Sequence, residues 1–164
     1  MTSTDHIRTR RQPRFHLYRE LVVPATLANV FTFFSDAHNL DRITPNFLKF
    51  RVLTQAPIDM HVGARIDYAL RLRGIPLSWT SEISAWEPPF RFVDTQIKGP
   101  YRSWIHEHRF EDMGNKTKVI DEVQYDFFGG YLVHTLFIKR DINRIFDHRT
   151  QALKSIFGDD SASS

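Results

Sequence analysis

Between Phe47 and Phe127 the chain reads as one strand after another, with turns between them that are only a few residues long. The turns fall at Gly74, at Pro88-Pro89, at Gly99-Pro100 and at Asp112–Asn115, all with typical turn compositions. Parallel neighbours require a crossover of about a dozen residues or more, so strands joined this closely must pair antiparallel. This run of short turns therefore predicts a single antiparallel sheet.

Alternation of apolar and polar side chains marks the individual strands. The alternation is clearest over 64–73, where apolar side chains face one way and arginines and an aspartate face the other. The first strand of the chain, 14–23, shows the same alternation and is ended by Pro24. The predicted strands are 14–23, 47–54, 64–73, 76–86, 90–97, 101–111 and 116–127.

Helical spacing of apolar residues occurs in three places. Apolar side chains of 27–34 recur at i, i+3, i+4 and i+7, and Thr26 is expected to cap this short helix through its hydroxyl. A second short helix is predicted over 37–43, and Thr44-Pro45 ends it, because a proline disfavours helix just before itself. The longest helix is predicted over 136–157, with Gly158 at its C-cap.

An antiparallel sheet has a face to bury, and only the C-terminal helix is long enough to cover it. We therefore predict an α+β fold, in which a curved antiparallel sheet of six to seven strands wraps around that helix. A twisted sheet curls, and one helix cannot fill the whole trough, so a cavity is expected between them. The alternative is that the aromatic side chains pack against one another and leave no cavity. The expected walls are Ile66, Tyr68, Leu70, Trp79, Phe92, Trp104, Phe110, Tyr125, Phe127 and Phe146.

The segment Trp104–Phe110 places two histidines between bulky aromatic residues on one face, because side chains two apart share a face of a strand. If the hairpin turn at 112–115 is a four-residue loop, His106 lies directly opposite Asp121, within hydrogen-bonding reach. Tyr125 continues the same face. A buried carboxylate needs a partner, so a His106–Asp121 pair is predicted.

Three interpretations of this group remain open. In the first, His106 and Asp121 fulfil each other's hydrogen bonding inside the core and have no further role. In the second, the histidines and Tyr125 orient the polar end of an apolar ligand. In the third, a histidine acts as a general base, or both histidines bind zinc or iron together with the carboxylate. No catalytic residue is assigned, and no metal or cofactor is expected. The candidates if the chain is an enzyme are His106, His108 and Asp121.

Arg149 is the other polar candidate, because it lies beside the apolar stripe of the predicted long helix. Its head can extend to solvent, as long cationic side chains commonly do. Alternatively it can reach into the cavity and meet a carboxylate, either of the protein or of a ligand.

Composition and charge exclude several function classes. The absence of cysteine excludes disulfides, thiol catalysis and Cys-ligated metal sites. Four arginines and one aspartate give residues 1–14 a net charge of 4 − 1 = +3, which leaves the remaining 150 residues at 3 − 3 = 0. A neutral body argues against binding to nucleic acid. There is no GxGxxG, P-loop, GxSxG or HExxH motif.

The predicted organisation is a disordered basic arm over 1–12, a single domain over 13–158 and a disordered tail over 159–164. No apolar run approaches the roughly 20 residues of a membrane span, and no secretory signal is recognised, so an integral membrane segment is not expected. We expect a cytoplasmic protein that is a monomer or a homodimer.

Several short segments within about residues 14–157 resemble a known family. They are Val23–Thr26 with Val30-Phe31, Asn39-Leu40 with Ile43–Pro45, Gly99–Tyr101, Trp104-x-His106-x-His108-x-Phe110, Asp121-x-Val123-x-Tyr125 and Ile145-Phe146-Asp147-x-Arg149. Together with the order of elements, they resemble the helix-grip fold of the START/polyketide-cyclase (SRPBCC) superfamily and its small bacterial ligand-binding members. The departure is Phe127–Gly130, where a proline-containing link is expected.

This resemblance implies a cavity for a small hydrophobic or aromatic ligand, such as a lipid, a polyketide-like or a quinone-like molecule. It does not by itself imply catalysis. The alternative is a cyclase/dehydrase- or hydrolase-type enzyme. The predicted ligand-binding residues are Tyr68, Leu70, Trp79, Trp104, His106, His108, Phe110, Asp121, Tyr125, Phe146 and Arg149.

Overall fold

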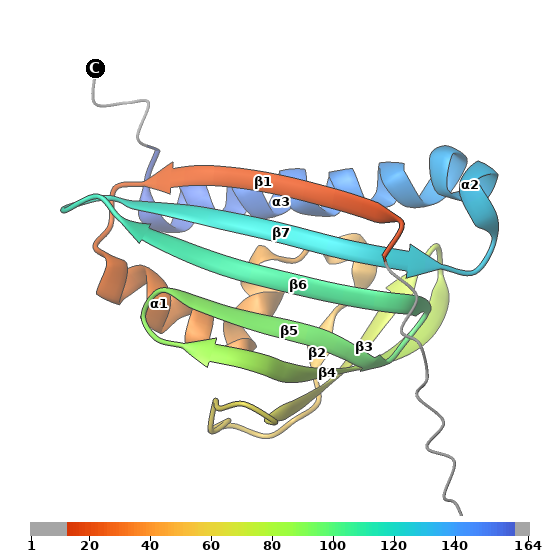
Figure 1. Cartoon of the computed structure of the whole chain (residues 1–164), viewed down its shortest axis with the longest axis horizontal. Coiled ribbons are helices and arrows are strands. Elements are labelled where there is room, and N and C mark those ends of the chain that lie inside the picture. The colour runs from red at the N-terminus through yellow and green to blue at the C-terminus, as the bar shows by residue number, and fades with distance from the viewer. Residues whose placement is uncertain (1–12, 160–164) are drawn as a thin grey trace, which may run out of the picture.

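The computed structural model describes residues 13–159, and it contains one curved antiparallel sheet with a long helix lying along it (Figure 1). Seven strands pair in the order β1-β7-β6-β5-β4-β3-β2. Their bounds are β1 Phe15–Val23, β2 Arg51–Val52, β3 Arg65–Leu72, β4 Ile75–Glu87, β5 Arg91–Lys98, β6 Tyr101–Asp112 and β7 Thr117–Phe127. The predicted fold class is confirmed.

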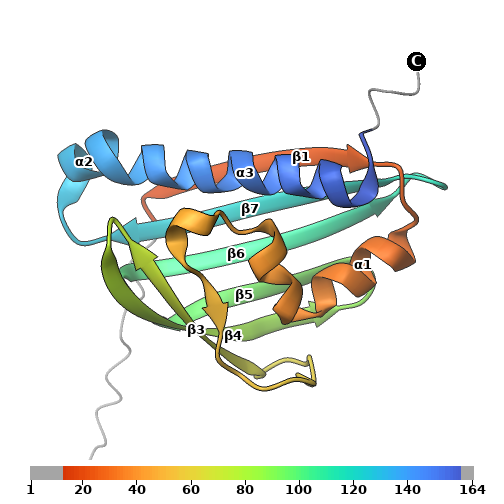
Figure 2. The ribbon, with the colours of Figure 1, turned by 180° about the vertical axis from the view of Figure 1, so that it is seen from behind.

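The helices lie on one side of the sheet, with α3 running along β1 and β7 and α1 lying over one end of the middle strands (Figure 2). Within the described residues, no helix is both long enough and apolar enough to span a membrane. The predicted arm, 1–12, and residues 160–164 of the predicted tail lie outside the described residues. The helical bounds are α1 Leu27–Ser35, η1 Ala37–Ile43, η2 Asn46–Leu48, α2 Gly130–Val133, η3 His134–Ile138 and α3 Lys139–Phe157.

The predicted strand over 47–54 is wrong, because only Arg51–Val52 pairs as a strand. The 3₁₀ turn η2 occupies its beginning, and Lys49 then adopts a left-handed conformation with φ 45° and ψ 40°. The apolar residues that suggested a strand are used differently, since Leu48 and Phe50 turn toward the cavity described below. These side chains are therefore buried by a 3₁₀ turn and the residue pair after it, and not by a strand of the sheet.

The helical prediction over 136–157 begins too late. Gly129, with φ 128°, turns the chain out of β7, and helix starts at once with α2 and the π-helical η3, which lead into α3. The glycine pair therefore starts the helix, and Gly130 is its first residue. Gly158 follows α3 with φ 101° and donates its N–H to the carbonyl of Lys154 at 2.9 Å, which confirms it at the C-cap.

The first helix begins at Leu27 as predicted, but the Thr26 hydroxyl makes no capping hydrogen bond, so that part of the prediction is wrong. Burial of its apolar side, including Val30 and Phe31, stabilises α1. Tertiary packing commonly outweighs local capping in a helix this short.

The β6–β7 hairpin is shifted by two residues from the predicted register. Asp112 pairs with Thr117, and the N–H of Met113 donates to the carbonyl of Lys116, so the loop is 113–116. His108, and not His106, therefore lies directly opposite Asp121. A shift of two residues keeps each side chain on its face, whereas a shift of one would reverse them all.

The core divides into two apolar clusters. The larger one lies beneath α1 and includes Phe31, Phe92 and Phe110. The smaller one lies beneath the N-terminal half of α3 and includes Tyr125 and Phe146. The buried polar side chains that belong to neither cluster include His106, His108, Asp121 and Arg149.

Candidate functional site

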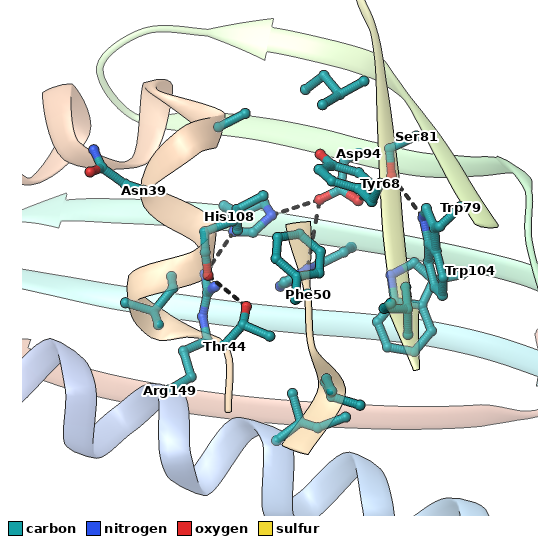
Figure 3. A pocket seen from close by; sticks show the side chains of 18 of the residues that line it. Asn39, Thr44, Phe50, Tyr68, Trp79, Ser81, Asp94, Trp104, His108 and Arg149 are labelled. Atoms are coloured by element: carbon teal, nitrogen blue, oxygen red, sulfur yellow. Dashed lines mark hydrogen bonds and ion pairs between the residues drawn. The ribbon is translucent and has the colours of Figure 1, made fainter. Parts of the chain in front are cut away.

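A cavity of about 200 Å³ lies between the sheet, α3 and the η1–η2 segment. Most of its wall is apolar and aromatic, with Phe50 and Tyr68 on one side and Trp79 and Trp104 on another (Figure 3). The two tryptophans meet edge to face, with ring centroids 5.4 Å apart. The expected gap between the curved sheet and its helix is therefore present.

The structure brings eight of the eleven predicted ligand-binding residues to this cavity, and it places the other three elsewhere. Whether the eight contact a ligand stays a prediction. The eight that line the cavity are Tyr68, Leu70, Trp79, Trp104, His106, His108, Phe146 and Arg149, whereas Phe110, Asp121 and Tyr125 do not line it.

Phe110 and Tyr125 lie on the expected inner face of the sheet, but helices cover them. Phe110 packs against Phe34 of α1, with ring centroids 5.0 Å apart. The hydroxyl of Tyr125 hydrogen-bonds Nε2 of the buried His134 at 2.8 Å. Among the other expected walls, Phe127 also lies outside the cavity lining. Their inclusion among the cavity walls was wrong. α1 covers Phe110, whereas Tyr125 and Phe127 lie against His134 of the helical segment that begins earlier than predicted.

One end of the cavity carries a polar cluster built from three neighbouring strands. His106 and His108 project from β6 with ring centroids 3.8 Å apart. Nε2 of His106 donates to Asp121 Oδ1 at 2.9 Å, so the predicted pair forms, through a diagonal contact. Nδ1 of His108 lies 3.2 Å from the same oxygen, and its Nε2 donates to Asp94 Oδ2 at 2.8 Å.

Arg149 reaches from α3 to the carboxylate of Asp121, behind the histidines. Its Nε and Nη2 donate to Oδ2 and Oδ1 at 2.8 and 2.9 Å. Its guanidinium also lies over the ring of Phe34, 5.1 Å from the centroid. Of the two alternatives for this arginine, the contact with a carboxylate of the protein is the observed one.

Asp94 is the functional candidate that the sequence analysis missed. It projects from β5 into the cavity lining, directly opposite His106 in the β5–β6 register. Its Oδ1 accepts a hydrogen bond from the Ser81 hydroxyl at 3.3 Å, and that hydroxyl accepts one from Trp79 Nε1 at 3.0 Å. The available signal was its place two residues after Phe92, on the inward face of the strand.

The surroundings of the two histidines shift their pKa values in opposite directions. Burial lowers the pKa of His106, and the neighbouring His108 lowers it further, to about 4. Burial also opposes the charge of His108, but the carboxylates of Asp121 and Asp94 outweigh it and raise its pKa. The pKa of His106 is thus displaced downward and that of His108 upward, so His108 holds its proton to a higher pH than His106 does.

Both carboxylates stay ionised in spite of their burial. Burial raises the pKa of Asp94, but hydrogen bonds from His108 and Ser81 outweigh it and lower the pKa. For Asp121, the Arg149 guanidinium overcomes burial and holds the pKa well below its usual range. Each buried carboxylate is thus paired, Asp121 with Arg149 and Asp94 with His108, as a buried charge requires.

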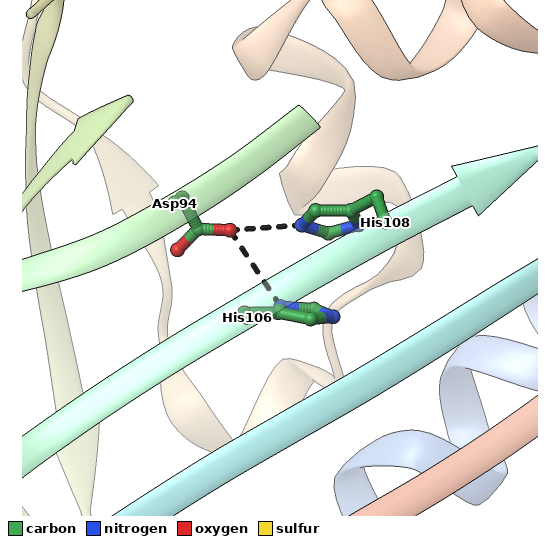
Figure 4. Close-up of side chains that lie close together, drawn as sticks. All are labelled: Asp94, His106 and His108. Atoms are coloured by element: carbon green, nitrogen blue, oxygen red, sulfur yellow. Dashed lines mark hydrogen bonds and ion pairs between the residues drawn. The ribbon is translucent and has the colours of Figure 1, made fainter. Parts of the chain in front are cut away.

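One chemical capability follows directly from this arrangement. Within residues 13–159, Nδ1 of His106 has no hydrogen-bond partner, so it is free to accept a proton or hydrogen bond from a molecule in the cavity. Asp121 is held behind the imidazoles and orients them, so the two histidines and Asp121, which one of the three interpretations took as a metal site, do not converge on the cavity. Asp94 faces the two histidines from the cavity side (Figure 4).

Comparison with known proteins identifies the chain's relatives. The family model described as polyketide cyclase/dehydrase and lipid transport matches residues 23–154. None of the curated protein sequences matches the chain.

Three solved structures illustrate the likeness of fold. Protein CV1439 from Chromobacterium violaceum is 13% identical with a TM-score of 0.70, covering 88% of this chain and 98% of its own. The Zhui aromatase/cyclase from Streptomyces sp. R1128 is 14% identical with a TM-score of 0.66, covering 85% and 90%. A START superfamily protein from Mycobacterium smegmatis is 10% identical with a TM-score of 0.66, covering 87% and 96%.

Proposed function

This chain belongs to the polyketide cyclase/dehydrase and lipid transport family, and on that premise we propose that it binds a small hydrophobic or aromatic molecule in the cavity beneath α3. The observation that carries the proposal is the cavity itself, with apolar and aromatic walls and polar groups gathered at one end. Ligand sites combine an apolar lining with a few placed polar groups in this way.

The walls indicate the chemistry of the ligand. Tyr68, Trp79 and Trp104 provide flat aromatic surfaces that suit a ring system. At the polar end, Nδ1 of His106 offers a hydrogen-bond acceptor, which suits a hydroxyl or phenol group. The ligand therefore has an apolar body and at least one hydrogen-bond donor.

Its size is also limited. A volume of about 200 Å³ lies below the range of about 300–1,000 Å³ that drug-sized ligands occupy. The cavity therefore suits a molecule of a few rings, or one end of a longer lipid, polyketide-like or quinone-like chain.

Native mass spectrometry of the purified protein, followed by solvent extraction, tests this proposal. We expect an apolar molecule that co-purifies and is released on denaturation. A protein that carries no adduct and takes up no member of a set of small aromatic phenols and quinones would contradict it.

A second candidate function is acid–base catalysis of the cyclase/dehydrase or hydrolase type. The observation in its favour is that His106 and His108 face the same cavity with pKa values displaced in opposite directions. Paired groups with separated pKa values are how active sites assign a base and an acid. Here His106 would be the base and Asp121 would orient both imidazoles.

The His106→Ala variant separates this function from binding alone. If the chain is an enzyme, the variant loses turnover of the captured molecule and keeps its fold. A variant that only melts at a lower temperature, with turnover unchanged, assigns His106 a structural role. A wild-type protein that returns every captured molecule unaltered would also rule catalysis out.

A further inference from the structure

Three potential metal ligands converge at the polar end of the cavity. They come from Asp94, His106 and His108, and one ligand atom of each residue lies within 4.8 Å of the others (Figure 4). Oδ2 of Asp94 faces Nδ1 of His106 and Nε2 of His108. The strands bring them together, because the histidines are two residues apart on β6 and Asp94 is paired with His106 across the β5–β6 ladder. Two imidazoles and one carboxylate form a common donor set for divalent zinc and iron.

The separations suit one small cation. Donor atoms about 2.0–2.1 Å from a tetrahedral zinc lie roughly 3.4 Å from one another. Asp94 Oδ2 lies 2.8 Å from the His108 nitrogen and 3.7 Å from the His106 nitrogen, so these two distances bracket the required value. Small rotations of the three side chains would admit the ion between them.

Both imidazoles are already oriented by a second carboxylate. Nε2 of His106 donates to Asp121 Oδ1 at 2.9 Å, and Nδ1 of His108 lies 3.2 Å from that oxygen and 3.3 Å from Arg149 Nη2. Metal-binding histidines typically hold their remote nitrogen against a carboxylate in this manner, which fixes the ring and its tautomer. Arg149 in turn fixes Asp121 through two hydrogen bonds.

The carboxylate ligand is oriented as well. The Ser81 hydroxyl donates to Oδ1 of Asp94, and Trp79 Nε1 donates to that hydroxyl. These contacts occupy Oδ1 and leave Oδ2 toward the histidines. Every member of the trio thus has an outer partner of the kind found around built metal sites.

We propose that Asp94, His106 and His108 bind one divalent transition-metal ion, of which zinc is the first to test. The three protein ligands leave a fourth position on the cavity side, open to water or to the polar group of a ligand. With both imidazoles neutral, as metal ligation requires, the two carboxylates and Arg149 sum to −1, and a divalent ion brings the group to +1. The open position therefore favours an anionic oxygen, such as a phenolate, enolate or carboxylate. This choice of ligand group deepens the proposed function and rests on it, whereas metal binding itself does not.

Calorimetric titration of the chelator-treated full chain with zinc chloride, without any apolar ligand, tests the site. We expect one equivalent of zinc to bind. Asp121→Asn should weaken that binding by about 10–100-fold, and Asp94→Asn and His106→Gln should weaken it by more. The matched control is His61→Ala, because His61 and Asp59 form an exposed pair 3.6 Å apart that does not line the cavity.

Two further measurements on the wild-type protein keep the test decisive if a variant fails to fold. Zinc should shift the imidazole NMR signals of His106 and His108 and leave those of His16 and His61 in place, and Co²⁺ should develop visible absorption bands. Absence of stoichiometric binding, or shifts confined to the surface histidines, would overturn the proposal. The apolar-ligand tests are run in chelator, so each idea can fail without the other.

Discussion

The guanidinium of Arg149 holds the carboxylate of Asp121 through two hydrogen bonds of 2.8 and 2.9 Å, across the interface between α3 and β7. Both side chains are buried, and the same carboxylate accepts from His106. This contact fixes the long helix to the sheet at the place where the two apolar clusters separate. It also fixes the orientation of the polar end of the cavity.

Replacement of Arg149 by methionine is expected to destabilise the fold strongly, because it leaves Asp121 ionised and buried without its main partner. The expected loss is about 3–5 kcal/mol in the free energy of unfolding, measured by urea denaturation. The control is Arg109→Met, which removes a partly exposed contact with Glu122 and should cost no more than about 1 kcal/mol. Equal losses in the two variants would contradict the account.

The protonation states of His106 and His108 should differ at the same pH. In chelator, long-range proton–nitrogen NMR spectra between about pH 5 and pH 7.5 should show His106 neutral throughout, since its pKa is about 4. His108 should keep its proton above pH 6.5, since its pKa is raised. Two histidines that titrate together near their ordinary pKa would contradict the electrostatic description.

The same shifts predict a pH dependence of stability. As the pH falls from about 6.5 to about 4, the unfolded chain protonates His106 and the folded protein does not, so the fold loses up to about 3 kcal/mol. His108 acts oppositely: its raised pKa stabilises the fold below pH 6.5, and that contribution is lost as the pH rises through the folded pKa. Urea denaturation of wild type and His106→Gln across this range checks the assignment, and the variant should lose less stability on acidification. An identical slope in both proteins would show that His106 does not contribute.

Tyr125→Phe tests whether Tyr125 stabilises the helical segment at His134 or contributes to the cavity. The variant removes the hydroxyl that hydrogen-bonds His134, and it should cost about 1–3 kcal/mol because a buried histidine nitrogen is left without its partner. Affinity for an apolar probe should not change, since Tyr125 does not line the cavity. A stable variant with weakened probe binding would return Tyr125 to the site.

Much of the candidate site could be predicted because strand alternation fixes which side chains share a face. That is why His106 and Asp121 meet even though the predicted register was displaced by two residues. The displacement itself was not predictable from composition, because the Asp112–Lys116 region allows more than one turn length. The hairpin closes with Met113 bonded to Lys116.

The errors share a physical cause, which is packing between segments distant in sequence. Asp94 was missed because its partners lie on β6, and the β4–β5 and β5–β6 registers cannot be counted from a single tight turn. In the segment 47–54, the apolar side chains of Leu48 and Phe50 are directed toward the cavity from η2 and the residues after it, without a strand. For Arg149, the sequence allowed either extension to solvent or contact with a carboxylate. Only the position of Asp121 beneath α3 decides between them.

The most direct test of the central claim, that the cavity binds an apolar molecule, is fluorescence titration with 1-aminoanthracene in chelator. Leu70→Trp fills the cavity, whereas Leu53→Trp makes the same change at a position that is 54% exposed and outside the lining. Wild type and Leu53→Trp should bind one equivalent with the same affinity, and Leu70→Trp should bind at least about tenfold more weakly while remaining folded, since a tenfold loss corresponds to about 1.4 kcal/mol. Failure of the wild-type protein to bind, or equal binding by all three proteins, would contradict the claim.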